Sequence, residues 1–174
     1  MRCAFLRGVN VNGRKVVMSE VCDIFRTAGM GNVSAVLATG NIIFDPPSDD
    51  DGLHDLLEDA LSAHYSEPFH LFVRTSEDLE RMVGHDPFDP GADFHVYVVI
   101  SDPRAGEELE KIFSGIDPAP GERGVIRDGV FYWRVAKGCT LSSGFSGILG
   151  RKDMRNRITS RNINTIKKIM SQMS

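Results

Sequence analysis

Two apolar runs that follow one another without an intervening helix decide the fold of this chain. They lie in residues 33–44, with the sequence VSAVLATGNIIF. We predict strands over residues 33–37 and 42–44, joined by a tight turn at residues 39–41, because glycine and asparagine tolerate the left-handed backbone that short connections require. This pair of strands is the centre of the order of elements from which the fold class follows.

On either side of the paired strands, the sequence predicts one helix and one further strand. Residues 2–6 form an apolar run typical of a buried strand, and a helix capped by Ser19 follows with apolar residues at helical spacing. Beyond the pair, an apolar stripe over residues 53–61 predicts a second helix, and residues 69–74 predict a strand. The order strand, helix, strand, strand, helix, strand is that of a ferredoxin-like α+β fold, in which two helices cover one face of the sheet.

The second half of the chain is predicted to be a smaller α/β part with a β-hairpin and C-terminal helices. Its clearest signal is Asp128-Gly129 between two strand-like runs, residues 125–127 and 130–135. This pattern predicts a hairpin with a type I′ turn. A further strand is predicted before it, at residues 94–100.

The C-terminal stretch is predicted to be helical and basic. Ser160 is expected to cap a final helix whose apolar residues face the core. Thr75 and Asp78 are expected to form a capping box at the start of a helix. A joint rich in proline and glycine, residues 85–91, follows and separates the two halves of the chain. We therefore expect a ferredoxin-like subdomain over residues 1–86 and a second α+β subdomain, with the basic helical segment, over residues 87–174.

The composition of the 174 residues, 41% hydrophobic and 25% charged, is that of an ordinary globular protein. No apolar run approaches the roughly 20 residues that span a bilayer, so we expect no membrane partner. The start of the chain is too short an apolar patch for a signal peptide, and three widely spaced cysteines indicate reduced thiols. These features predict a cytoplasmic protein.

Charge is distributed unevenly along the chain, although the net charge is only −4. Residues 1–135 hold 12 lysines and arginines against 23 acidic residues, whereas residues 136–174 hold 8 against 1. An acidic body with a basic end favours either association of opposite charges, as in a homodimer, or an end that binds anions.

The strongest candidate for a binding site is the loop of residues 7–15, with the sequence RGVNVNGRK. Its glycines let a ligand approach the backbone, and free N–H groups ahead of a helix form a concavity for anions. Its three cations would add charge-assisted hydrogen bonds to a phosphate or carboxylate. The spacing of the two glycines resembles that of a P-loop, but Arg14 stands where that motif needs lysine. A tight strand-to-helix turn with solvated cations is the structural alternative.

A second candidate is the basic segment of residues 151–168, whose cations could contact the phosphates of a nucleic acid. Binding of single strands also needs aromatic platforms, and Phe131, Tyr132 and Trp133 lie in the hairpin before this segment. A solvated helix face is the structural alternative, because runs of charge usually are solvated.

No catalytic residues or cofactor follow from the sequence. The five histidines show no metal-ligand spacing, so no metal site is predicted. Residues 144–147, GFSG, lack the final glycine of a nucleophile elbow. Whether the chain is an enzyme is left open, and an enzyme, a ligand-binding protein and a non-catalytic interaction protein are all carried as alternatives.

Several polar motifs resemble those of a known family. They occupy residues 6–14 with 39–44, residues 72–75 with 86–88, and residues 159–165. In this order they are similar to the bacterial domain of unknown function 1697 over nearly the whole chain. The resemblance implies a compact α+β protein with a ferredoxin-like part, and it implies no activity.

From this resemblance we predict that three of the motifs converge on one cleft that binds an anionic small molecule. They are the first loop, the 39–41 turn and the closing Arg-Asn motif, and all three are rich in Gly, Asn and Arg. A pure scaffold would need only packing at these places. The predicted ligand-binding residues are Arg7, Gly8, Asn10, Asn12, Gly13, Arg14, Lys15, Asn41, Arg161 and Asn162.

Overall fold

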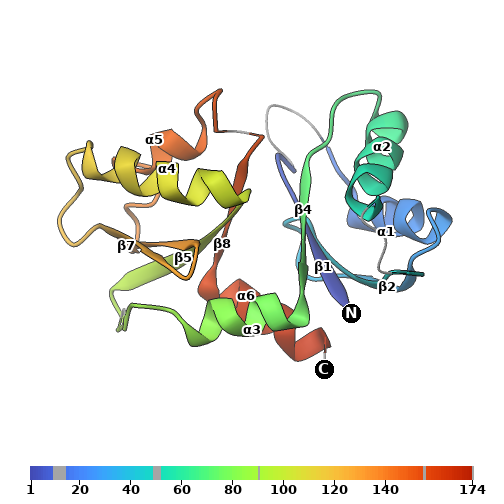
Figure 1. The fold of residues 1–174 in the computed structure, drawn as a ribbon, viewed down its shortest axis with the longest axis horizontal. Coiled ribbons are helices and arrows are strands. Elements are labelled where there is room, and N and C mark those ends of the chain that lie inside the picture. The colour runs from blue at the N-terminus through green and yellow to red at the C-terminus, as the bar shows by residue number, and fades with distance from the viewer. Residues whose placement is uncertain (10–14, 49–51, 90, 155, 174) are drawn as a thin grey trace. The chain divides into compact units, whose positions relative to one another are not determined.

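The structure is a computed structural model, and it describes residues 1–9, 15–48, 52–89, 91–154 and 156–173. Its chain divides into two units, both drawn in Figure 1. Unit 1 comprises Met1–Leu79 and Lys168–Ser174, and unit 2 comprises Glu80–Lys167. The chain passes from unit 1 to unit 2 within helix α3 (Ser76–Gly84) and returns within helix α6 (Ile163–Met173).

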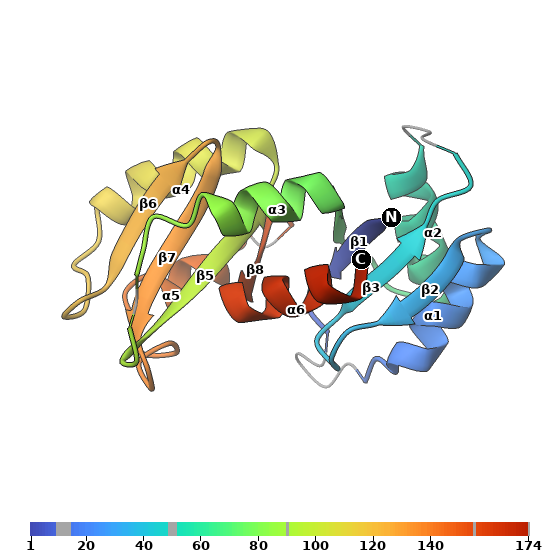
Figure 2. The same cartoon turned by 90° about the horizontal axis from the view of Figure 1, so that it is seen from below.

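Unit 1 has the predicted order of strands and helices, and the ferredoxin-like fold class is confirmed. Its elements are β1 (Arg2–Leu6), α1 (Met18–Thr27), β2 (Gly31–Ala35), β3 (Asn41–Asp45), α2 (Leu53–Tyr65) and β4 (Leu71–Thr75). The strands form an antiparallel sheet in the order β2-β3-β1-β4, so β1 is paired on both sides. Helices α1 and α2 lie together on one face of this sheet (Figure 2).

The core of unit 1 follows from the alternation of side chains along its strands. Ala4, Leu6 and Phe44 are buried in one cluster with Phe25 of α1 and Leu57 of α2. The rings of Phe25 and Phe44 meet edge to face, with centroids 5.4 Å apart. Full burial of a large apolar side chain contributes about 1.5–3 kcal/mol, so this face holds the two helices on the sheet.

Unit 2 repeats the same order of elements. They are β5 (Phe94–Ser101), α4 (Pro103–Ser114), β6 (Arg123–Arg127), β7 (Val130–Ala136), α5 (Ser146–Leu149) and β8 (Ile158–Asn162). The sheet order, β6-β7-β5-β8, corresponds strand for strand to that of unit 1. The predicted smaller α/β part is therefore itself a βαββαβ unit, whose second helix is reduced to four residues.

Two local predictions are confirmed because their signals lie within a few residues of sequence. The hairpin of β6 and β7 turns at Asp128 and Gly129, which have positive φ angles of 50° and 78° as a type I′ turn requires. Thr75 and Asp78 form the predicted capping box of α3. The Thr75 N–H donates to Asp78 Oδ2 at 3.1 Å, and the Asp78 N–H donates to Thr75 Oγ1 at 3.2 Å.

Two predicted helix starts are wrong. Helix α1 begins at Met18, after Val17, so Ser19 lies inside the first turn instead of capping it. Ser160 lies in strand β8, opposite Val99 of β5, and α6 begins only at Ile163. In the second case pairing with a strand distant in sequence outweighs the local capping preference of serine.

A buried carboxylate joins segments of unit 2 that are far apart in sequence. Glu122 is 4% exposed. Its Oε2 accepts a hydrogen bond from the Ala119 N–H at 2.8 Å, and its Oε1 accepts from Trp133 Nε1 at 2.9 Å and from the Phe145 N–H at 3.2 Å. Burying a carboxylate without such donors costs free energy, and these three hydrogen bonds offset that cost for Glu122.

We expect Glu122→Gln to lower the free energy of unfolding by about 2 kcal/mol, because the amide replaces one acceptor oxygen with a donor that faces other donors. Urea denaturation measures the change. Glu110→Gln, at an exposed position of α4, is the matched control and should stay within about 0.5 kcal/mol of the unsubstituted protein. Equal stability of the two variants would show that the buried hydrogen bonds contribute little.

Candidate functional site

The structure describes part of the predicted binding loop. Arg7, Gly8 and Lys15 are among the described residues, with Arg7 half-buried and Lys15 exposed. The other predicted residues of the loop lie outside the described residues; they are Asn10, Asn12, Gly13 and Arg14. The loop begins where β1 ends and leads toward α1.

The end of β1 is fixed by the two strands beside it. The Leu6 N–H donates to the Gly40 carbonyl at 2.8 Å, ahead of β3. The Arg7 N–H donates to the His70 carbonyl at 2.9 Å, ahead of β4. Gly8 then turns the chain with a φ angle of +69°, a conformation that glycine adopts without steric cost. The first residues of the loop are therefore anchored on both sides at one corner of the sheet.

The 39–41 turn packs directly against the start of the loop. Gly40 has a φ angle of +74°, and a Cβ atom on it would lie 2.7 Å from Val9 Cγ2 and 3.0 Å from Leu6 Cβ. Asn41 is fully buried, and its side-chain nitrogen donates to the Val36 carbonyl and to Thr39 Oγ1, both at 2.9 Å. The structure thus brings two of the three motifs together, with Asn41 holding the turn from inside.

A group of ionisable side chains lies at the start of β4, beside His70. Glu58 Oε1 accepts a hydrogen bond from the Leu71 N–H at 2.9 Å and lies 3.4 Å from His54 Nε2 and 3.6 Å from His70 Nδ1. Burial lowers the pKa of His54, but its contacts with Asp55, Glu58 and the Leu71 carbonyl outweigh this and raise the pKa overall. Glu58 is therefore one of the groups that favour the protonated form of His54.

Arg161 and Asn162 lie in unit 2, in strand β8, and face opposite sides of the sheet because successive strand residues alternate. The Arg161 guanidinium donates to Thr159 Oγ1 at 2.8 Å and to the Ser160 carbonyl at 2.9 Å. Asn162 Nδ2 lies 3.3 Å from Nδ1 of His95. The convergence of this pair with the loop of unit 1 stays a prediction.

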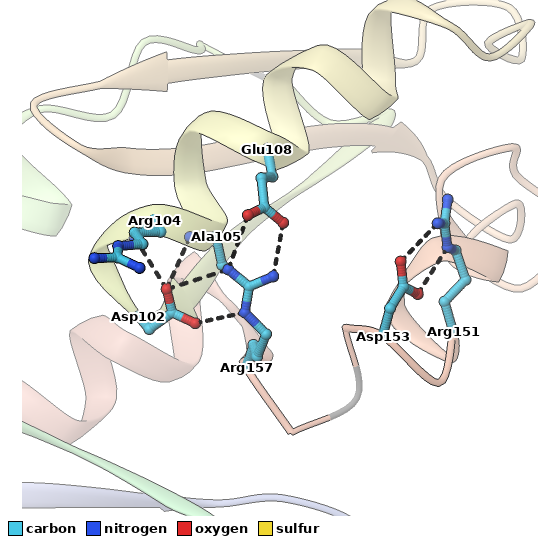
Figure 3. Close-up of polar contacts among 7 residues, drawn as sticks. All are labelled: Asp102, Arg104, Ala105, Glu108, Arg151, Asp153 and Arg157. Carbon is cyan, nitrogen blue, oxygen red and sulfur yellow. Dashed lines mark hydrogen bonds and ion pairs between the residues drawn. The ribbon is translucent and has the colours of Figure 1, made fainter.

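The basic segment that follows α5 contains two arginines engaged by carboxylates (Figure 3). Arg157 Nε lies 2.9 Å from Asp102 Oδ2, and its Nη1 lies 2.6 Å from Glu108 Oε2. Arg151 is paired with Asp153 at 2.7 Å. The Arg157 pairs connect the segment to the first half of α4, and all of these ion pairs leave less of its positive charge for an external partner.

The same ion pairs shift the pKa values of the groups that form them. Burial alone would raise the pKa of Asp102, but hydrogen bonds from Arg157 and from the N–H groups of Ala105 and Arg104 lower it overall. The hydrogen bond from Arg157 also lowers the pKa of Glu108. Asp102 in addition caps α4, since its Oδ1 accepts from both of those N–H groups at 2.9 Å.

The aromatic residues of the β7 hairpin are core residues. Phe131 and Tyr132 are 0% exposed and Trp133 is 1% exposed. The Tyr132 hydroxyl donates to the Met82 carbonyl at 2.9 Å, and burial raises the pKa of this tyrosine to about 12. These three rings are therefore not available as stacking platforms for nucleic-acid bases.

The described residues offer neither a metal centre nor a membrane segment. Within them, no three His, Cys, Asp or Glu side chains are grouped so as to hold a metal ion. None of the helices in the described ranges combines the length and the apolar character that crossing a bilayer requires.

Two antiparallel sheets with the same βαββαβ order define the class: a tandem of ferredoxin-like units. The family model of the protein of unknown function DUF1697 matches residues 1–132, and the chain belongs to this family, as its motifs predict. No curated protein matches the chain. A similar solved structure is that of the conserved bacterial protein SP0830 from Streptococcus pneumoniae, with 21% sequence identity, a TM-score of 0.77, and coverage of 99% of this chain and 98% of that chain. The likeness confirms the fold.

Gly40→Ala should lower the free energy of unfolding by about 2 kcal/mol or more, because the added methyl group meets Val9 and Leu6 and the left-handed backbone disfavours alanine. Urea denaturation measures the loss. Gly84→Ala is the control, since a Cβ at that position has no described atom within 4 Å other than those of its chain neighbours and its own helix. If both variants lose the same free energy of unfolding, the turn does not pack closely against the loop.

Acid should weaken unit 2 through the Asp102–Arg157 pair. Because the folded pKa of Asp102 lies below its unfolded value, the pair stabilises at neutral pH and its contribution is lost as the pH falls below about 4. Asp102→Asn retains the helix cap and removes the charge, so its free energy of unfolding should fall less steeply on acidification. Exposed Asp117→Asn is the control. Parallel pH curves for Asp102→Asn and the unsubstituted protein would contradict the pairing.

Proposed function

We propose that unit 1 binds the anionic group of a small molecule at the loop of residues 7–15. The observation that supports this most directly is the packing of the loop against the Gly40 turn, where no Cβ atom fits. The described start of the loop, residues 7–9, is held in this way without a ligand, so less ordering of these residues is needed on binding.

The corresponding corner of unit 2 supports the proposal by contrast. There the Asp102 N–H donates to the Arg157 carbonyl at 3.1 Å. This hydrogen bond corresponds to the one from the Arg7 N–H to the His70 carbonyl in unit 1. Asp102 caps α4 directly, so β5 passes into its helix without a loop. Unit 1 therefore carries, between β1 and α1, a connection that the fold itself does not require, and such connections commonly hold binding residues.

The start of α1 also favours the binding of an anion. Val17 precedes this helix and provides no side-chain acceptor for the N–H groups of the first turn. These groups carry the positive end of the helix dipole, and an anion beside them is stabilised. Lys15, which is exposed, lies two residues earlier in the chain. The chemistry favours a phosphorylated or carboxylated small molecule, whether it is bound or also converted.

A nucleic-acid-binding module has no such support. The aromatic rings of β7 are buried, and carboxylates engage both Arg151 and Arg157. An interaction protein that associates through opposite charges stays an alternative without a structural observation in its favour. The anion site in unit 1 is the proposal that the described residues support best.

Titration with inorganic phosphate, followed by the backbone amide signals of Gly8 and Gly40, tests the proposal. Both signals should shift and saturate, and Arg7→Gln should weaken binding roughly tenfold because a charge-assisted hydrogen bond is lost. Arg26→Gln, at an exposed arginine paired with Asp23, is the matched control and should leave binding unchanged. Arg161→Gln measures whether the closing motif contributes, as the convergence prediction requires. Signals of Gly8 and Gly40 that do not respond to phosphate would overturn the proposal.

A further inference from the structure

Two arginines of unit 2 lie directly opposite each other on neighbouring strands. Arg123 of β6 and Arg134 of β7 are register partners in the antiparallel pair, so their side chains share one face of the sheet. Like charges in this arrangement repel each other and destabilise the sheet. Within the described residues, no carboxylate lies within ion-pair distance of either arginine. The pair therefore has an unbalanced double positive charge.

The guanidinium of Arg134 is held in a fixed orientation. Its central carbon lies 4.7 Å from the centroid of the Phe94 ring and 5.4 Å from that of Phe88. Its Nε donates to the Gly121 carbonyl at 3.2 Å. Gly121 is required at this place, because a Cβ atom on it would lie 2.6 Å from the Phe94 ring. Contacts with two aromatic rings and one carbonyl leave the side chain little rotational freedom.

The ring of Phe88 is itself positioned by the chain before it. The Phe88 N–H donates to Asp86 Oδ1 at 3.0 Å, which closes a turn around Pro87. These three residues are one of the motifs by which the sequence resembles its family, and the structure gives the motif a physical role. The motif places the Phe88 ring against Arg134. Because these two residues are far apart in sequence, a local pattern does not reveal the contact.

The terminal nitrogens of Arg134 indicate which class of ligand the two arginines would bind. Neither Nη1 nor Nη2 makes a hydrogen bond to any described residue, while Nε is already engaged. A guanidinium held in this way presents a planar pair of donors that matches two oxygens of a phosphate or carboxylate. Arg123, which is exposed, supplies a second set of donors from the opposite strand.

We propose that Arg123 and Arg134 form a binding site for a phosphate monoester. A monoester carries a charge of about −1.5 to −2 at neutral pH and therefore balances both guanidinium groups, whereas a carboxylate balances one. Binding relieves the repulsion between the two arginines in addition to forming charge-assisted hydrogen bonds. The site lies wholly within unit 2 and does not depend on the loop of unit 1.

Titration of the full chain with glycerol 2-phosphate at neutral pH tests the site, with the backbone amides of Gly121 and Gly124 and the Nε–H of Arg134 as reporters. These signals should shift and saturate, and acetate at matched ionic strength should bind roughly tenfold more weakly. Arg123→Gln and Arg134→Gln should each weaken binding of the ester roughly tenfold or more. Signals of Gly8 and Gly40 report the unit 1 site in the same spectra, so either proposal can fail alone.

Two further variants separate a built site from general attraction of anions. Arg127→Gln removes the same charge from the same face of β6, opposite Val130, and should leave binding unchanged. Phe88→Leu keeps every charge but removes one aromatic face from Arg134, and it should weaken binding a few-fold. If Arg127→Gln weakens binding as much as Arg123→Gln, or if the reporter signals shift without saturating, the pair is a solvated charged surface and the proposal is wrong.

Discussion

Both sheets depend on one constraint, which is that the first strand of each unit is paired on both sides. Strand β1 lies between β3 and β4, and β5 lies between β7 and β8. Because these pairs are antiparallel, the end of the first strand meets the beginnings of its neighbours. The hydrogen bond of Arg7 with His70 follows in unit 1, and that of Asp102 with Arg157 follows in unit 2. The corner from which the candidate loop emerges is therefore set by topology and not by the sequence of the loop.

Features that depend on neighbouring residues could be predicted from the sequence, and features that depend on distant partners could not. The Asp128-Gly129 turn and the capping box of Thr75 are local, and both were predicted correctly. Strand β8 is not predicted from the sequence, which instead favours Ser160 as the cap of the last helix. Pairing with β5 decides the conformation of this segment, and such pairing is invisible in a single local pattern. For the same reason the full second βαββαβ unit did not follow from the sequence, since its second helix is only four residues long.

The candidate site could be predicted in part. Glycine-rich composition indicates both the first loop and the 39–41 turn. The lack of a Cβ atom on Gly40 is what lets the turn pack against the loop. The role of Asn41 inside the turn follows from its complete burial, which composition does not reveal. The uneven charge of the sequence is also partly balanced within unit 2, where Arg157 of the basic end meets Asp102 and Glu108 of the acidic body. Charge counted along a sequence therefore overstates what the folded unit presents to partners.

Glu122 has a consequence for how unit 2 moves. One carboxylate accepts hydrogen bonds from the connection before β6, from the centre of β7 and from the residue that begins the α5 turn. A helix of four residues has no stability of its own, so α5 depends on this bond and on its buried apolar neighbours for its order. Release of either connection would leave a buried anion short of donors, which penalises partial opening. The two connections are thus expected to fluctuate as one cooperative segment instead of as independent loops.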